Sequence, residues 1–349
     1  MSKVLKVVDI SEPIESISDT LLEAAREQGF LFVEGHDFTQ EEVDILFTLS
    51  KQFFEETPDD VKSQYSINKN NIGYTHFTNE QLDPRKARDF KEGYNFGFIN
   101  FKTGQFNINE DEYMGKENTD SQRTSGSKND VPTFFQSKQE LISRTTQKLH
   151  ATAARILEVM TRGLQVEDPE FFTSKHRPDK PSGCVFRMLR YPLIREDLDA
   201  TLDYDPTIRA GAHTDYGSLT LLFQREGQQG LQLQTGDPEN NDGWTEVPFV
   251  RSKYEGKAPP LVVNFGDLLS YWTNGVLKST VHRVKFSPGE SRESDRYSIV
   301  FFVHPENSTL LTPVPSELVA SAGNGAAPPT ITAAQHLQER LAATYESRT

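Results

Sequence analysis

The sequence predicts an α+β protein with a mainly β core, namely a double-stranded β-helix (jelly roll) with buttressing amino-terminal helices and a carboxyl-terminal helix. Two observations predict this class. Segments between residues 13 and 163 place apolar residues at helical spacing, whereas short β-rich runs separated by Gly, Pro and Asp follow from residue 184. Helices in front of many short strands, without an apparent internal repeat, favour one domain over residues 1–349.

The first elements follow from local patterns. Residues 4–10 form a short β-prone run, and residues 13–28 predict a helix that Gly29 ends. Residues 30–33, which are all apolar, return to a strand. The apolar residues of the predicted helix recur at helical spacing: Ile14, Ile17, Leu21, Leu22 and Ala25.

A second helix is predicted over residues 39–54. Thr39 is a typical N-cap residue, and Glu41 and Glu42 lie in the first turn, where carboxylates interact favourably with the helix dipole. Its buried side consists of Val43, Leu46, Phe47 and Phe53. Residues 58–64 predict one further short turn of helix.

The stretch from 65 to 135 is polar and rich in Asn, Gly and Asp. Within it, residues 91–97 predict an ordered strand and turn. Residues 109–130 contain almost no apolar side chains and predict a solvated or mobile loop. Residues 135–163 then predict a long amphipathic helix, which completes a helical amino-terminal part over 1–180.

The jelly-roll core is predicted over residues 181–310, and residues 311–349 form a carboxyl-terminal extension. A helix over 332–345 begins at Thr332, shortly after two prolines. In a β-barrel of this kind, side chains from opposite sheets converge at the open end, which suits a small-molecule or metal site.

Composition narrows the function classes. The hydrophobic share is 35% and the charged share 25%, as in ordinary globular proteins. A net charge of −14 argues against a nucleic-acid partner, and no apolar run predicts a membrane span. Cys184 is the single cysteine, expected to be a buried hydrophobe, so no intrachain disulfide is possible. We expect a cytoplasmic protein, whose oligomeric state the sequence does not define.

Three residues predict a metal centre. Residues two apart on an extended strand point the same way, so His213 and Asp215 can bind one ion. His282 would complete the set from a distant strand. Two imidazoles and one carboxylate hold non-haem Fe(II) on one face and leave positions open for substrate and oxygen. For an isolated His-x-Asp, however, a strand that ends at a surface turn is the commoner explanation.

Arg296 and Ser298 form a second polar pair at i, i+2, on a strand that follows His282. A guanidinium binds a carboxylate with two parallel hydrogen bonds, and a hydroxyl can add a third. The alternative for Arg296 is a surface salt bridge. The order His-x-Asp, distant His and Arg-x-Ser is far more specific than any of these motifs alone.

The amino-acid sequence around these motifs resembles the isopenicillin N synthase-like branch of the 2-oxoglutarate/Fe(II) dioxygenases. The segments are RAGAHTDYGSLTLLFQ (209–224), VVNFGDLLSYW (262–272), KSTVHRV (278–284) and RYSIVFFVHP (296–305). Among relatives, fungal thymine hydroxylase-type enzymes are the most similar in these segments: HTDYGSLTLLFQ, KSTVHRV, RYSI and the closing RLAATY. Part of the sequence also resembles ethylene-forming enzymes. The resemblance covers nearly the whole chain, loosely before residue 180.

The resemblance implies the same jelly roll and an Fe(II) ion on His213, Asp215 and His282. It implies that Arg296, Ser298 and Tyr191 bind the co-substrate 2-oxoglutarate. This chain has Leu189 where many plant relatives have Asn. The implied reaction consumes O₂, oxidises a C–H bond of a small molecule and releases succinate and CO₂, with ascorbate as a stimulant. No catalytic residue is expected beyond the metal centre.

Substrate contacts are predicted mainly from the resemblance. Arg187, Tyr216 and Phe302 match positions that contact substrate in relatives, and Tyr94, together with Phe96, could reach the site from the front half. Phe302 could equally be a core residue, as an aromatic in an apolar strand usually is. Asn264 and Asp267 resemble a family turn and are expected to be structural. The remaining histidines are expected to be structural or at the surface: His36, His76, His150, His176, His304 and His336.

Three functions remain open at this point. The first is a hydroxylase of natural-product or pyrimidine metabolism, with desaturation or ring rearrangement as related outcomes of the same machinery. The second is an ethylene-forming type of 2-oxoglutarate oxygenase. The third is a non-catalytic jelly-roll protein that binds or senses a small molecule. The residues do not identify the substrate.

Overall fold

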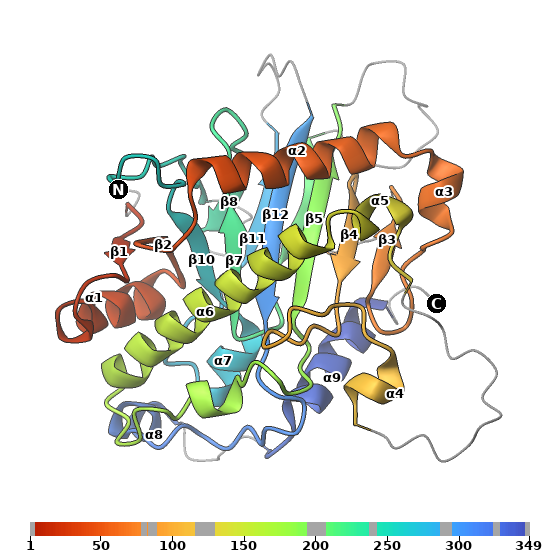
Figure 1. Ribbon diagram of the computed structural model, residues 1–349. Coiled ribbons are helices and arrows are strands. Elements are labelled where there is room, and N and C mark those ends of the chain that lie inside the picture. Colours follow the sequence, from red (N-terminus) through yellow and green to blue (C-terminus); the bar gives the residue numbers. More distant parts are fainter. Residues whose placement is uncertain are drawn as a thin grey trace.

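The computed structural model describes residues 4–77, 82, 89–115, 130–193, 207–236, 243–286, 295–323 and 329–345 (Figure 1). Within them, two sheets face each other. The larger sheet has the order β1 (Val7–Asp9), β2 (Phe30–Glu34), β10 (Leu261–Phe265), β7 (Leu219–Phe223), β12 (Arg296–Val303), β5 (Val185–Tyr191), β4 (Glu92–Phe96) and β3 (Gly73–Thr75). The smaller sheet has the order β6 (Ile208–His213), β11 (His282–Lys285), β8 (Leu231–Gln234) and β9 (Trp244–Glu246).

The helices surround this double sheet. α2 (Gln40–Glu56) and α6 (Gln139–Gly163) cross one face of the larger sheet, and α1 (Ile14–Glu27) packs beside α6 (Figure 1). The shorter helices in the described residues are α3 (Asp59–Ser63), α4 (Glu110–Tyr113), α5 (Thr133–Gln136), α7 (Asp267–Trp272) and α8 (Glu317–Ala322). The last helix, α9 (Ala333–Tyr345), contacts α7.

The alternation of side chains along β12 shows how the layers are built. Ile299, Phe301 and Val303 point to the helices and join the larger hydrophobic core. Val300, between them, belongs to a second core that lies between the two sheets. Each fully buried apolar side chain of this kind contributes about 1.5–3 kcal/mol. The strand is therefore buried on both faces, which fixes its register and places Arg296 and Ser298 between the sheets.

The structure agrees with most of the predicted elements. Helix α2 begins where expected, because Thr39 and Glu42 form a reciprocal capping box. The predicted helix over 135–163 is divided into α5 and α6, and α6 begins at Gln139. The jelly roll buttressed by helices is confirmed. Its larger sheet draws strands from both halves of the chain, in keeping with one domain.

The predicted loop over 109–130 needs a correction at its start. Residues 110–113 form helix α4, and Tyr113 is buried. Its hydroxyl accepts a hydrogen bond from the backbone N–H of Ser182 at 3.0 Å, so a contact distant in sequence anchors this polar segment. Residues 116–129 lie outside the described part of the chain.

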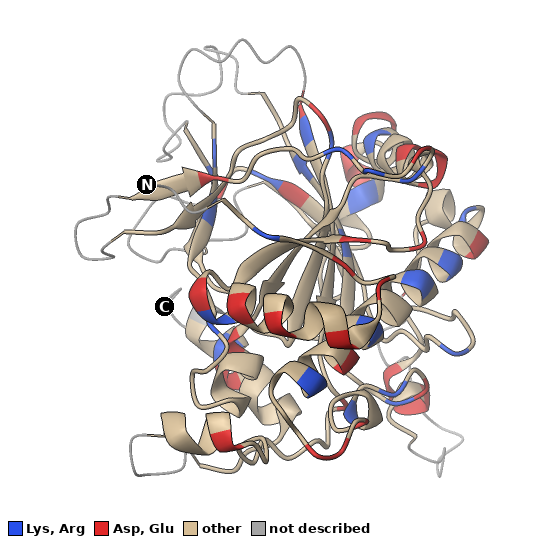
Figure 2. Ribbon diagram, turned by 90° about the vertical axis from the view of Figure 1, so that its left-hand side faces the viewer, with Lys and Arg blue, Asp and Glu red and all other residues tan. Residues whose placement is uncertain are grey.

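Charged side chains of both signs are interspersed along the outer helices (Figure 2). One example is the Lys51–Glu55 pair on α2, at 3.8 Å. Exposed pairs of this kind contribute little to stability. A search of the described residues finds no helix with both the length and the apolar character needed to cross a membrane.

Candidate active site

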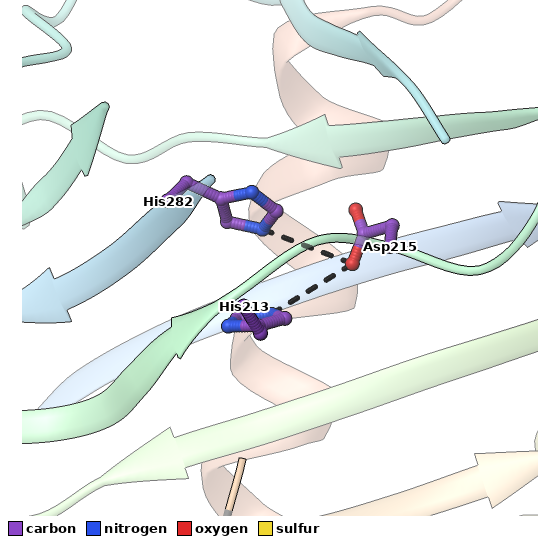
Figure 3. Close-up of side chains that lie close together, drawn as sticks. All are labelled: His213, Asp215 and His282. Carbon is purple, nitrogen blue, oxygen red and sulfur yellow. Dashed lines mark ion pairs between the residues drawn. The ribbon is translucent and has the colours of Figure 1, made fainter. Parts of the chain in front are cut away.

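The three predicted metal ligands meet at the end of the smaller sheet (Figure 3). His213 is the last residue of β6 and His282 the first of β11, and antiparallel pairing sets the two opposite each other. Asp215 follows β6 by two residues. Its Oδ1 lies 3.8 Å from Nε2 of His213 and 3.7 Å from Nε2 of His282 (Figure 3). The ligand atoms all lie within 4.8 Å of one another.

Backbone carbonyls orient both imidazoles. Nδ1 of His213 lies 2.7 Å from the carbonyl oxygen of Gly211, and Nδ1 of His282 lies 3.0 Å from that of Thr280. A carbonyl oxygen only accepts, so each Nδ1 carries the ring proton and each Nε2 presents a lone pair. The ring of Phe30 packs edge-on against His282 at 5.3 Å between centroids. Each imidazole is therefore prepared for coordination through Nε2.

Two neighbouring strands orient the carboxylate. Oδ2 of Asp215 accepts hydrogen bonds from the hydroxyl of Thr220 at 2.7 Å and from the amide of Asn264 at 2.8 Å. Thr220 on β7 and Asn264 on β10 are register partners, so the sheet itself sets the distance between these two donors. Oδ2 is thereby committed to the protein, and Oδ1 faces the imidazoles.

Asp267 holds the loop that carries Asp215. Its backbone N–H donates to the carbonyl oxygen of Asp215 at 2.8 Å. Its carboxylate accepts from the hydroxyls of Thr214 at 2.9 Å and Ser279 at 2.6 Å. The close approach of this turn to the loop of Asp215 requires Gly266, because a Cβ there would collide with the carbonyl oxygen of Gly217. The turn predicted to be structural is thus also the support of the centre.

Burial sets the charges of these groups. Burial, followed by the neighbouring His282, lowers the pKa of His213 to about 3. Burial alone would raise the pKa of Asp215, but the two imidazoles and the hydrogen bonds from Thr220 and Asn264 outweigh it and lower that pKa. At neutral pH the group is a neutral His213 beside an ionised Asp215, the protonation states that metal binding requires.

The three residues fit a metal ion. Two atoms that bind one ion at about 2.1 Å lie roughly 3–4 Å apart, as Oδ1 and the Nε2 atoms do here. A donor set of two imidazoles and one carboxylate is that of non-haem Fe(II) sites with open positions. The other ring nitrogens and the other carboxylate oxygen are already bound by the protein, as outer-shell partners of metal ligands are.

A cavity of about 380 Å³ extends from this centre along β5 and β12. One face of β12 lines it with alternate residues, which are Arg296, Ser298, Val300 and Phe302, followed by His304 beyond the strand. Phe302 is the register partner of Thr220, the residue that binds Asp215. The metal centre therefore lies between the Arg296 end and the His304 end of the cavity. We call these the co-substrate end and the substrate end.

The three residues predicted to bind 2-oxoglutarate meet at the co-substrate end. Arg296 is 3% exposed, and its guanidinium lies over the ring of Tyr191, its register partner, at 4.9 Å. It donates to the hydroxyl of Ser298 at 2.5 Å and to the carbonyl oxygen of Gln228 at 2.8 Å. A buried, oriented guanidinium in a cavity wall is suited to an anion, and this burial argues against the surface salt bridge considered for Arg296.

Of the predicted substrate residues, Arg187, Tyr216 and Phe302 line the cavity. Phe302 is partly buried, in contrast to its neighbours in the core. Tyr94 does not line the cavity, so that prediction is wrong. Its side chain is 0% exposed and packs in the hydrophobic core against Phe53, at 5.4 Å between ring centroids. Phe96 occupies the same core.

Sequence reasoning missed several cavity residues. His304, expected to be structural or at the surface, is buried and lines the substrate end. Lys91 also lines the cavity, and its Nζ donates to the buried Asp89 at 2.8 Å. Asp89 in turn accepts from the backbone N–H of Gly211, whose carbonyl orients His213. The i, i+2 spacing of Asp89 and Lys91 is the sequence signal that could have found this pair.

Comparisons with known proteins agree with this geometry. Residues 184–305 match the model of the 2OG-Fe(II) oxygenase superfamily. Residues 5–114 match a model described as non-haem dioxygenase in morphine synthesis, N-terminal. Together the two models span most of the chain and contain every strand of the two described sheets.

Two curated relatives match over most of the chain. The 2-oxoglutarate-Fe(II) type oxidoreductase hxnY of Emericella nidulans is 30% identical over 290 residues, which are 80% of this chain and 71% of that protein. The UPF0676 protein C1494.01 of Schizosaccharomyces pombe is 29% identical over 97% of this chain and 92% of its own.

Two solved structures share the fold. The full-length thymine hydroxylase of Neurospora crassa, solved in complex with alpha-KG, has a TM-score of 0.70 at 24% identity, over 96% of this chain and 95% of that one. A putative oxygenase of Caulobacter crescentus has a TM-score of 0.72 at 27% identity, over 97% and 99%. The chain belongs to the 2OG-Fe(II) oxygenase superfamily and is a 2-oxoglutarate- and Fe(II)-dependent dioxygenase.

Proposed function

We propose that His213, Asp215 and His282 bind the Fe(II) ion and that the enzyme hydroxylates a C–H bond of a small organic molecule. One observation carries the proposal. In each of these side chains, every polar atom other than the proposed ligand atom is already hydrogen-bonded within the protein. Both Nδ1 atoms bind carbonyls and Oδ2 binds two donors, so one nitrogen from each ring and one oxygen converge on one point.

Arg296, Ser298 and Tyr191 bind 2-oxoglutarate in this proposal. The guanidinium of Arg296 pairs with the carboxylate farther from the metal, and Ser298 adds its hydroxyl. The ring of Tyr191 covers the guanidinium and keeps water from it. Because Arg296 is buried, the pair forms in a medium where charges interact more strongly than in water.

The bound ion supplies the activation of O₂, coupled to the decarboxylation of 2-oxoglutarate to succinate and CO₂. The protein residues position the reactants. One oxygen atom enters the product as a hydroxyl and the other enters succinate, so the reaction balances without an external reductant. Arg187, Tyr216 and Phe302 orient the substrate beside the metal, and their positions decide which C–H bond is oxidised.

The substrate class is a natural product or a pyrimidine. The motif wording around His213 and Arg296 favours thymine as the first compound to test. The amino-terminal family model, described as non-haem dioxygenase in morphine synthesis, favours natural-product chemistry. Desaturation and ring rearrangement are alternative outcomes of the same site, and ascorbate is expected to sustain turnover. The net charge of −14 argues against a nucleic-acid substrate.

The test combines binding and turnover. Under anaerobic conditions, titration calorimetry should show that Mn(II) binds the protein and that 2-oxoglutarate binds more tightly once Mn(II) is present. With Fe(II), ascorbate and O₂, the protein should form succinate, and a panel of pyrimidines and fungal metabolites should raise the rate. Mass spectrometry of the consumed compound then identifies the product.

The matched variants are His213→Ala and His76→Ala. His76 is exposed and remote in sequence from the centre, so its loss should leave binding and turnover unchanged. His213→Ala should abolish both metal-dependent 2-oxoglutarate binding and succinate formation. Full activity in His213→Ala, or a wild-type protein that binds Mn(II) without any effect on 2-oxoglutarate, would show that the ion belongs elsewhere.

A further inference from the structure

Helix α9 forms one wall of the substrate end. Four of its residues line the cavity, which are Ala334, Leu337, Gln338 and Leu341. Their spacing of three, four and seven residues places them on one face of the helix. Leu337 and Leu341 are partly buried, whereas Gln338 is at the exposed rim. This wall belongs to the carboxyl-terminal extension rather than to the jelly roll.

The wall is in close contact with the strand that carries Arg187. A Cβ at position 183, just before β5, would collide with the Cδ2 atom of Leu337. Leu337 therefore packs directly against the backbone at Gly183. The adjacent Cys184 is 3% exposed and lines the same cavity. Apolar side chains thus face one another across the substrate end, from α9 on one side and β5 on the other.

One side chain joins α9 to the metal loop. Arg340 makes an ion pair with Asp267 at 2.7 Å and lies 3.4 Å from the hydroxyl of Thr214. Its guanidinium also lies over the ring of Tyr216 at 5.2 Å. Thr214 and Tyr216 flank Asp215 in the sequence, and Asp267 donates its backbone N–H to Asp215. Arg340 therefore contacts the residues on both sides of a metal ligand.

We propose that α9 determines substrate specificity in this enzyme. Leu337 and Leu341 contact an apolar group of the substrate, at the end remote from the carbon that is oxidised, and Arg340 is the positioning residue that holds the helix against the metal loop. The inference rests on the proposed function, because it assumes that the organic substrate occupies this end. It adds the chemistry of the substrate, which carries a hydrocarbon chain or ring remote from the oxidised carbon, so it favours a natural product over thymine.

Cys184 offers a direct measurement of the wall. It is the single cysteine of the chain, follows Gly183, which contacts Leu337 of α9, and lines the same cavity as that helix. Burial raises the pKa of its thiol to about 11, so alkylation of the closed protein is slow. The rate of alkylation by iodoacetamide, measured on the full chain with Mn(II) and 2-oxoglutarate bound, therefore reports how often α9 moves away from β5.

The first comparison is Arg340→Met with Arg144→Met. Arg144 is an exposed arginine on α6, so its loss should not change the alkylation rate. Loss of the partly exposed ion pair of Arg340 should raise the rate by about two- to fivefold. Arg340→Lys keeps a cation for Asp267 and should restore most of the protection. Equal rates in Arg340→Met and Arg144→Met, or no rescue by Lys, would overturn the positioning role.

The second comparison tests the apolar subsite. Benzyl alcohol should slow the alkylation of Cys184 in the wild-type protein, while ethanol at the same concentration should not. Leu341→Ala should weaken the protection by benzyl alcohol and leave the binding of 2-oxoglutarate unchanged. Equal effects of the two alcohols would refute the apolar subsite. These readouts do not depend on succinate formation, so their failure is distinguishable from a failure of the proposed function.

Discussion

The two ends of the cavity are built in different ways. At the metal and co-substrate end, each functional side chain comes from a strand or the turn beside it, is mostly buried, and has its orientation set by backbone pairing, as for Arg296 opposite Tyr191. At the substrate end, strands β5 and β12 still contribute Arg187 and Phe302, but the rest of the wall comes from α9, the segment before β5 and the end of α4. These segments lie outside the strands, and α9 is partly exposed.

This difference assigns the reaction chemistry to the first end and substrate selectivity to the second. Strand pairing constrains the metal ligands to a narrow range of positions, because a shift by one residue would reverse every side chain. Helix α9 is not a member of either described sheet, so its cavity-lining residues, unlike Arg340, can change without moving the ligands. We therefore expect substitutions at the first end to affect every substrate alike, and substitutions at the second end to affect substrates differently.

The largest effect is expected from Asp215→Ala. The change removes the anionic ligand and leaves the hydroxyl of Thr220 and the amide of Asn264 without their acceptor. Loss of an outer-shell partner alone costs about ten- to a hundredfold in metal affinity, so loss of the ligand should cost more than that. Calorimetry with Mn(II) measures the affinity. If the variant retained wild-type affinity, the metal would not bind at the loop of Asp215.

Low pH is expected to destabilise the fold at both ends of the cavity, so here the two ends should not differ. Burial lowers the pKa of His176, which binds Ser218 beside the metal loop, to about 4, and lowers that of His304, at the substrate end, to about 3. The unfolded chain takes up these protons near pH 6.5 and the folded chain does not. Stability is therefore complete above pH 6.5 and falls as the pH decreases toward 4.

The expected loss is on the order of 3 kcal/mol for each of these histidines. Urea unfolding of the metal-free protein between pH 7 and pH 4 measures it. His176→Phe removes one of several buried histidines whose pKa is lowered, so it should flatten the profile in part, although its stability at pH 7 falls because Ser218 loses its partner. A free energy of unfolding that did not change over this range would contradict the neutral state of both imidazoles.

Arg296→Gln tests the co-substrate end by itself. The amide keeps a donor but loses the charge and the two parallel hydrogen bonds to a carboxylate. Hydrogen bonds to charged groups contribute about 1.5–3 kcal/mol, so 2-oxoglutarate should bind roughly ten- to a hundredfold more weakly, with metal affinity unchanged. Leu341→Ala is the matched change at the other end and should not alter 2-oxoglutarate binding. Equal losses in both variants would mean that the two ends are not separate.

The sequence predicted the first end better than the second. Strand alternation and the order of the motifs place the polar residues of this end together once the strands pair. The sequence therefore predicts them: His213, Asp215, His282, Arg296 and Ser298. Helix α2 is readable from its local cap at Thr39. Arg340 and Leu337 were not found, since their role depends on where α9 docks. No local pattern determines that docking, because its contacts join residues distant in sequence, such as Arg340 with Asp267 and Leu337 with Gly183.

The errors have physical causes as well. Tyr94 lies on β4, whose five residues are all buried, so no alternation of polar and apolar residues shows which face is the core. Gly93, its neighbour, faces the cavity side, where a Cβ would lie 3.1 Å from Nε of Arg187. Helix α4 was missed because its stability comes from the distant contact of Tyr113 with Ser182 rather than from its composition.

Thr220→Val is expected to have the smallest effect and gives the sharpest test of the metal end. The two side chains have similar shapes, so the hydroxyl is lost without a cavity. Asn264 still binds Oδ2 of Asp215, and the carboxylate keeps one of its two donors. Metal affinity should fall by about tenfold, the lower range for outer-shell partners, and the ratio of rates between two substrates should not change. Thr48→Val, at an exposed position on α2, is the control. A changed substrate ratio in Thr220→Val would show that the carboxylate orients the substrate as well as the ion, and the separation of the two ends would fail at the metal itself.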